Sequence, residues 1–84
     1  MDKSGVTVQF FAAARAAVGS PELLVAAGSL AGILDEIAKA HPQFGQVRPR
    51  CSFLVDGLAA HGDPEEILLE DGATLDVLPP FAGG

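Results

Sequence analysis

Apolar and polar residues alternate in several short segments of the chain, and this period of two is typical of strands with one buried face. In the first segment, residues 6–11, the side chains of Val6, Val8 and Phe10 share one face, whereas Phe11 points to the opposite face. We expect further strands at residues 22–26, 51–55 and 75–78, and a short return strand at 58–60.

A spacing of three and four residues follows Ser29 and predicts the one main helix of the chain. Ser29 is a good N-cap, because its side-chain oxygen can accept a hydrogen bond from the first turn. His41 followed by Pro42 ends the helix, since the residue before a proline avoids the helical conformation. The apolar stripe that this helix would bury consists of Leu30, Ile33, Leu34 and Ile37.

Four other segments carry weaker signals. The alanine-rich residues 12–18 receive no element, and residues 42–49 are expected to form a connector. Asp63 followed by Pro64 is typical of a helix start, but so few apolar residues follow that we expect a single turn. Asp56-Gly57 is a hairpin signal, and it joins the third strand to the short return strand.

These elements predict a two-layer α+β domain, with one mixed sheet of four to five strands packed on one main helix. The first and second strands would be antiparallel, and the first and last would lie parallel in the middle of the sheet. The chain has 84 residues, which is enough for one domain only. We expect residues 1–80 to form this domain and residues 81–84 to form a flexible tail.

Charge and composition narrow the possible partners. Eleven acidic residues against five basic ones give a net charge of −6, so nucleic acid and anionic membranes are unsuitable ligands and a basic protein surface is favoured. The first residues lack the apolar core of a secretory signal, and no apolar run is long enough to span a bilayer. A single cysteine fits a reducing compartment, and we expect a cytoplasmic protein.

The sequence contains no recognisable catalytic or metal-binding constellation. Cys51, His41 and His61 are not arranged at metal-ligand spacings, and no nucleophile or phosphate-binding motif is present. Cys51 alternates with the apolar residues of a predicted strand and is interpreted as a small core residue. An enzyme with its own active site is therefore the least favoured class.

The unusual chemistry lies after the last strand. Prolines stiffen the start of this segment, and glycines without a Cβ can enter a slot too narrow for a side chain. The reactive group at its tip is the carboxylate of Gly84, which is a poor electrophile and would need activation by a partner enzyme, for example by adenylation. The segment consists of Pro79, Pro80, Phe81, Ala82, Gly83 and Gly84.

A second feature predicts docking beside this tail. If the first and last strands are neighbours, Phe11 and Leu78 both face away from the helix and lie close together. An exposed apolar patch of this kind usually marks a protein interface.

The segment Phe11 to Arg15 (F-A-x-x-R) and the ending P-P-x-x-G-G resemble the MoaD/ThiS-like sulfur carriers, in particular the small subunit of molybdopterin synthase. The resemblance spans essentially the whole chain and implies the ubiquitin-like β-grasp fold. It also implies that Arg15 is the motif arginine, which fixes the loop after the first strand or pairs with an acid of a partner.

The resemblance implies a function as well. An E1-like adenylyltransferase would activate Gly84 with ATP and magnesium, and a sulfurtransferase persulfide would convert it to a thiocarboxylate. The tail would enter the large synthase subunit, with Gly83 as the threading spacer, and give sulfur to a pyranopterin precursor. Two carriers and two large subunits would form a heterotetramer. Phe11 and Leu78 match the docking positions, and the carrier itself would bind no cofactor.

Two alternatives remain open from the sequence. The first is a sulfur carrier for thiazole (thiamine) or cysteine synthesis, which would share the fold and the Gly-Gly ending; the F-A-x-x-R motif and the double proline favour the molybdopterin branch. The second is a ubiquitin-like binding module without chemistry at its terminus.

Overall fold

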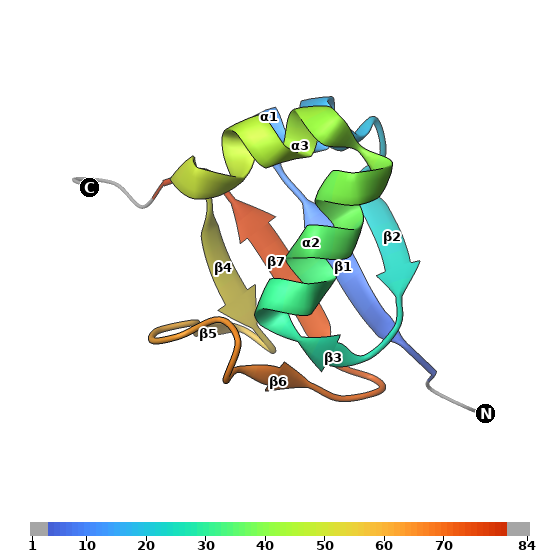
Figure 1. Cartoon of the computed structure of the whole chain (residues 1–84), viewed down its shortest axis with the longest axis vertical. Helices are drawn as coiled ribbons and strands as arrows, with labels where there is room; N and C mark the ends of the chain where they lie inside the picture. The colour runs from blue at the N-terminus through green and yellow to red at the C-terminus, as the bar shows by residue number, and fades with distance from the viewer. Residues whose placement is uncertain (1–3, 81–84) are drawn as a thin grey trace.

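The computed structural model describes residues 4–80, which fold into a mixed five-stranded sheet with helices on one face (Figure 1). A two-stranded ladder at the base of the molecule accompanies this sheet. In chain order the elements are β1 (Val6–Phe10), α1 (Ala12–Val18), β2 (Glu22–Val25), β3 (Gly28–Ser29), α2 (Leu30–Ala40), α3 (Pro42–Val47), the 3₁₀ helix η1 (Arg48–Arg50), β4 (Ser52–Val55), β5 (Leu58–Ala59), β6 (Leu68–Leu69) and β7 (Thr74–Leu78).

The sheet has the strand order β2-β1-β7-β4-β5, so the first and last strands are neighbours. They run parallel, whereas β1 with β2, β4 with β7 and β4 with β5 are antiparallel. The hairpin signal is confirmed: Asp56 and Gly57 both have positive φ angles, 50° and 84°, as a tight β4–β5 turn requires. The predicted α+β architecture and the parallel central pair are therefore confirmed.

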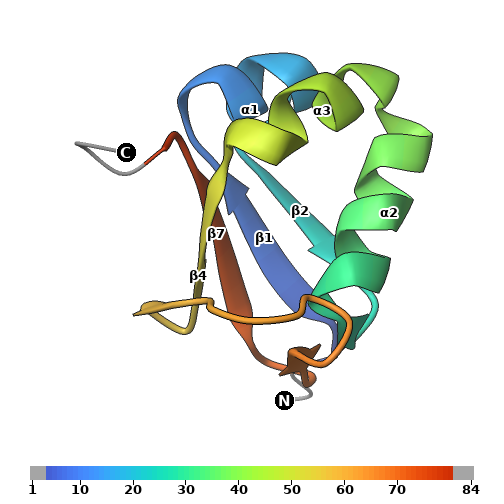
Figure 2. The same cartoon turned by 60° about the vertical axis from the view of Figure 1, so that its left-hand side comes forward.

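The core lies between the sheet and the helices, as Figure 2 shows from the side. Val6, Val8 and Phe10 of β1 are fully buried, and so are Leu75 and Val77 of β7. The alternation of apolar and polar residues therefore predicted the inward face correctly. The helical side of the core includes the predicted stripe of α2, Leu30, Ile33, Leu34 and Ile37, all of which are buried.

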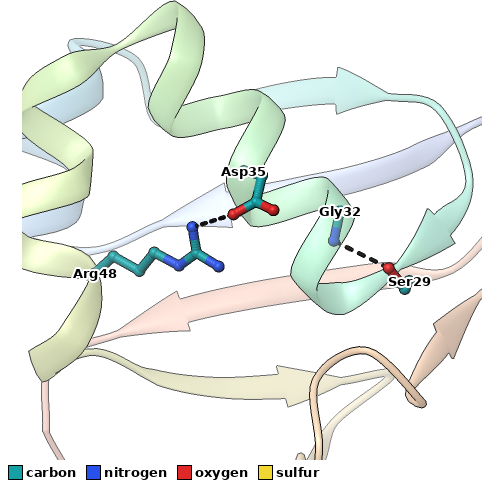
Figure 3. A network of polar contacts seen from close by, with 4 residues as sticks. All are labelled: Ser29, Gly32, Asp35 and Arg48. Atoms are coloured by element: carbon teal, nitrogen blue, oxygen red, sulfur yellow. Dashed lines mark hydrogen bonds and ion pairs between the residues drawn. The ribbon is translucent and has the colours of Figure 1, made fainter.

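Helix α2 begins and ends where the sequence predicts (Figure 3). The Ser29 Oγ accepts a hydrogen bond from the Gly32 N–H at 3.0 Å, which satisfies one of the free donors of the first turn. On the exposed side, Arg48 donates to Asp35 at 2.7 Å and joins η1 to α2. This pair is exposed to solvent, so its contribution to stability is small.

The expectation of a connector at residues 42–49 is wrong, because this segment forms α3 and part of η1. Phe44 of α3 is fully buried, and its ring meets that of Phe10 edge-on at a centroid distance of 5.9 Å. A six-residue helix is too short to show a helical period in the sequence, which is why the pattern missed it. Phe44 is its buried residue, and the packing of this side chain stabilises the helix. Pro42 occupies its first turn, where a missing N–H costs nothing.

Three further elements, α1, β3 and β6, extend the predicted set. The alanine-rich segment forms helix α1, which ends at Gly19 in the left-handed conformation with φ 82°. Strands β3 and β6 pair over two residues each, which is too short for alternation to be visible. The predicted turn after Asp63 is present: the Asp63 Oδ1 accepts from the Glu65 N–H at 2.9 Å.

Within residues 4–80 no helix is long and apolar enough to cross a membrane.

Candidate functional site

The tail is rooted at the end of the central strand β7. Leu78 is its last residue, and Pro79 and Pro80, which follow, are exposed to solvent. Proline has no N–H and a fixed φ, so neither residue can extend the ladder between β1 and β4. The chain therefore leaves the sheet here. Phe81, Ala82, Gly83 and Gly84, which carry the predicted tail chemistry, lie outside the described residues.

Phe11 and Leu78 lie at the same end of the neighbouring strands β1 and β7, as the sequence predicts. The Phe11 N–H donates to the Val77 carbonyl at 3.0 Å, which continues the parallel register in which Phe10 is paired with Val77. The backbone of Phe11 is extended, with φ −128° and ψ 150°, so its side chain points away from the buried Phe10. The Phe11 side chain is 36% exposed and that of Leu78 is half-buried.

The next strand enlarges this apolar area. In the β4–β7 ladder Leu54 pairs with Asp76 and Ser52 pairs with Leu78, so Leu54 belongs to the same outer face. We call Phe11, Leu54 and Leu78 the outer patch. Helices cover only the opposite face of the sheet (Figure 2), so among residues 4–80 no helix covers the outer patch.

Asp76 lies within this face and was not singled out from the sequence. It occupies the central strand, with Gln9 in register on β1 and Leu54 on β4. Its Oδ1 atom is buried and has no hydrogen-bond partner among the described residues. A buried acceptor without a donor is costly, because it has lost its hydration. The available signal in the sequence is an acid at the centre of an otherwise apolar strand.

Arg15 lies on α1, directly above the end of β1. Its Nε donates to the carbonyl of Phe10 at 3.3 Å. This hydrogen bond joins the motif arginine to the end of the first strand, a contact that one of its two expected roles requires, and the choice between the two roles stays a prediction.

Beyond the tail, the chain carries possible metal-ligating side chains and the thiol of Cys51. Among residues 4–80 there is no group of three metal-ligating side chains. Cys51 is half-buried rather than fully in the core, and its Sγ donates to the Val47 carbonyl at 3.3 Å. Burial raises the pKa of the Cys51 thiol, which keeps it protonated and a weak nucleophile. The geometry brings together the outer patch and the end of β7, where Pro79 and Pro80 follow.

Comparison with known proteins gives this arrangement a family. Residues 8–84 match the ThiS family. The search of curated proteins found no match. Among solved structures, small archaeal modifier protein 1 (SAMP1) from Methanosarcina acetivorans is 26% identical over 96% of this chain and 97% of that chain, with a TM-score of 0.82.

Two molybdopterin-related structures also share the fold. The putative molybdopterin converting factor, subunit 1, from Pyrococcus furiosus is 24% identical over 92% of this chain and 98% of that chain, with a TM-score of 0.74. A chain from the complex of subunits 1 and 2 of the molybdopterin-converting factor from Helicobacter pylori is 20% identical over 94% and 97%, with a TM-score of 0.68. The family match covers nearly the whole chain and includes the Gly-Gly ending. The chain therefore belongs to the ThiS family of ubiquitin-like sulfur carriers and has their β-grasp fold.

Proposed function

We propose that this chain is the sulfur-carrying small subunit of a molybdopterin synthase, with Gly84 as the sulfur-bearing residue. The observation that carries the proposal is the family match through residue 84, on a domain whose described residues offer no metal-ligand cluster and only a protonated thiol. The F-A-x-x-R motif and the double proline favour the molybdopterin branch over carriers for thiazole or cysteine synthesis.

The chemistry begins at the Gly84 carboxylate. In an E1-like adenylyltransferase, a carboxylate oxygen attacks the α-phosphorus of ATP, and pyrophosphate leaves with the help of magnesium. The outer sulfur of a sulfurtransferase persulfide then displaces AMP from the acyl carbon. A thiol cleaves the sulfur–sulfur bond and is itself oxidised to a disulfide, which leaves a thiocarboxylate on Gly84. The carrier binds neither ATP nor magnesium itself.

The large synthase subunit is the proposed acceptor. The outer patch would dock on it, Pro79 and Pro80 would direct the tail, and Phe81, Ala82 and Gly83 would thread its channel to the pyranopterin precursor. The Helicobacter pylori relative was solved as a complex of subunits 1 and 2, which supports a partner of this kind. Two carriers and two large subunits would form the heterotetramer. Asp76 would accept a hydrogen bond from a basic group of the partner, because its Oδ1 has no donor among residues 4–80.

One observation favours a second candidate function. A relative with a TM-score of 0.82 is a small archaeal modifier protein. In a modifier, the nucleophile that attacks the activated Gly84 acyl group would be an amine of a target protein, in place of the persulfide. The same tail, the same activation step and the same outer patch would serve both reactions.

The test is mass spectrometry of the whole chain after incubation with ATP, magnesium, an E1-like activating enzyme and a sulfur donor. We expect one oxygen to be replaced by sulfur, and fragmentation to locate the sulfur at Gly84. Location matters because oxidation of Met1 or Cys51 changes the mass almost identically. Addition of the large subunit and a pyranopterin precursor should then return the terminus to a carboxylate as the dithiolene forms.

A chain lacking Gly84 is the matched control. It should fold as the full chain does, since the tail follows the last strand, and it should accept no sulfur. Sulfur transfer by this truncated chain would contradict the carrier role. A terminus joined to lysine side chains, rather than one that delivers sulfur to the precursor, would favour the modifier.

A further inference from the structure

A groove lies beside the edge strand β2, on the side of the sheet that faces α2. Strand β2 is the outermost strand next to β1, two positions away from the tail-bearing β7 (Figure 1). The groove has a volume of about 570 Å³. Its apolar floor comes from Leu23 and Val25 of β2 and from Ile33 and Ile37 of α2. This site therefore shares no residue with the outer patch.

The backbone of β2 leaves hydrogen-bonding groups free along the groove. The Phe10 N–H donates to the Pro21 carbonyl at 2.9 Å. At this position of the β1–β2 ladder, the backbone groups of the two strands therefore point toward each other. In an antiparallel ladder, residue pairs whose backbone groups bond to each other alternate with pairs whose groups point away. Val8 and Leu23, two residues from Phe10 and Pro21, are therefore again a bonded pair, and Leu24 is not in one. The N–H and carbonyl of Leu24 consequently point outward, and among residues 4–80 no strand pairs with that edge.

The outward groups of Glu22, by contrast, are already engaged. The Ser20 hydroxyl donates to the Glu22 carbonyl at 2.9 Å and accepts from the Glu22 N–H at 3.4 Å. The free part of the edge is thus centred on Leu24, directly beside the groove. The Leu24 side chain is 70% exposed on the opposite face, where a neighbouring strand would cover part of it.

Charge selects the kind of segment that fits. Glu36 is the only lining residue with a formal charge at neutral pH, and the whole chain carries −6. The one ion pair among the described residues joins Arg48 to Asp35, so Glu36 is not neutralised in this way. A second copy of this chain would bring its own negative charge to the edge, whereas a basic segment would gain from the contact.

We propose that the β2 edge and the β2–α2 groove bind an extended, basic segment of a partner protein, which adds as a further strand to the sheet. Its backbone pairs with that of Leu24. Alternate aliphatic side chains enter the groove over Ile33 and Ile37, and a Lys or Arg side chain meets Glu36. Main-chain hydrogen bonds supply affinity and the alternate side chains supply selectivity, as in other cases of strand addition.

The experiment titrates a short capped peptide, Lys-Thr-Val-Thr-Val-Thr-Lys, into the isotope-labelled full chain and follows the amide resonances by NMR. The Lys and Val side chains of this peptide lie on one face of the strand, so both kinds can reach the groove. We expect shifts centred on Leu24 and the inner face of α2, with little change at Phe11 and Leu78. A peptide of the same sequence with N-methylated amides should bind much more weakly, because it cannot donate to the edge. A Glu-for-Lys peptide should also bind weakly.

Two variants test the contacts separately. Glu36→Lys should lower the affinity for the Lys peptide about tenfold and raise the affinity for the Glu peptide. Glu66→Lys makes an equal charge change on the turn that precedes β6 and should leave both affinities unchanged. Leu24→Pro removes an outward N–H together with the exposed Leu24 side chain, and edge strands tolerate proline, so this variant should abolish strand pairing while the fold is retained. A chain lacking Gly84 should bind the peptide normally, which separates this proposal from the sulfur-carrier function.

The proposal is overturned by several results. These are equal binding of the N-methylated peptide, shifts centred on the outer patch, an affinity insensitive to Glu36→Lys, or self-association of the chain through β2 in place of peptide binding.

Discussion

Asp76 shows how a single residue of the outer face can trade stability for binding. Its Oδ1 is buried without a donor among the described residues, in a central strand where a β-branched side chain packs better. We predict that Asp76→Thr raises the free energy of unfolding by about 1 kcal/mol, because an unsatisfied acceptor is removed. Urea unfolding with an unchanged m-value would measure this. The same variant should bind the partner more weakly.

Asp56 is the matched control for Asp76. Its Oδ1 accepts from the Thr74 N–H at 2.9 Å, and its φ of 50° is one that aspartate tolerates better than threonine. Asp56→Thr should therefore lower the free energy of unfolding. If both substitutions destabilise the protein equally, the Asp76 carboxylate is satisfied in solution and the interpretation of its orphaned oxygen is wrong.

Cys51 gives a prediction about pH. Burial raises the pKa of its thiol in the folded state above that in the unfolded state. The folded state therefore holds the proton more tightly, so the contribution to stability is full below the ordinary thiol pKa and is lost as the pH rises through the folded value. Alkylation by iodoacetamide should be slower for the native chain than for the urea-unfolded chain. The alkylation rate of the native chain should also begin to rise at a higher pH than that of the unfolded chain. Equal pH profiles would contradict this.

At the scale of elements, the sequence predicts the strands and helices that are long enough to show a hydrophobic period and misses the short ones. Strands such as β1 alternate over enough residues for their inward face to be recognised, and α2 shows its stripe and its Ser29 cap. Helix α3 and the β3–β6 ladder lack such a pattern, because packing and pairing with distant segments stabilise them. The outward-facing positions of Phe11 and Leu78 followed from alternation, whereas the isolation of Asp76 and the β2–α2 groove depend on how elements pack.

Helix α3 provides the element-scale prediction. Phe44 is fully buried against Phe10, so Phe44→Leu should lower the free energy of unfolding by about 1–2 kcal/mol through lost contact and an incompletely filled site. Gln43→Ala, at an exposed position of the same helix, should change it by less than about 0.5 kcal/mol. Chemical unfolding of both variants would check the difference. Similar small effects from both substitutions would mean that α3 is not held by Phe44.

The whole molecule combines an acidic chain with two separate candidate binding sites on opposite faces of one sheet. The outer patch lies on the face without helices, where β1 and β7 end, and the β2–α2 groove lies on the helix side, beside the edge strand β2. A partner held at the groove would leave the outer patch free. The net charge of −6 should speed association with basic partners at either face, and salt should slow it.

The final prediction separates charge from apolar contact in the proposed docking on a large synthase subunit. Phe11→Asp places a carboxylate in the outer patch, and we expect it to weaken association by more than ~1 kcal/mol, chiefly through faster dissociation. Leu24→Asp adds the same charge at an exposed apolar position of edge strand β2 and should have little effect on this partner. Titration calorimetry at two salt concentrations would compare the variants. If both lose affinity equally and high salt removes the loss, net charge rather than the outer patch governs docking, because direct apolar contacts are not screened by salt.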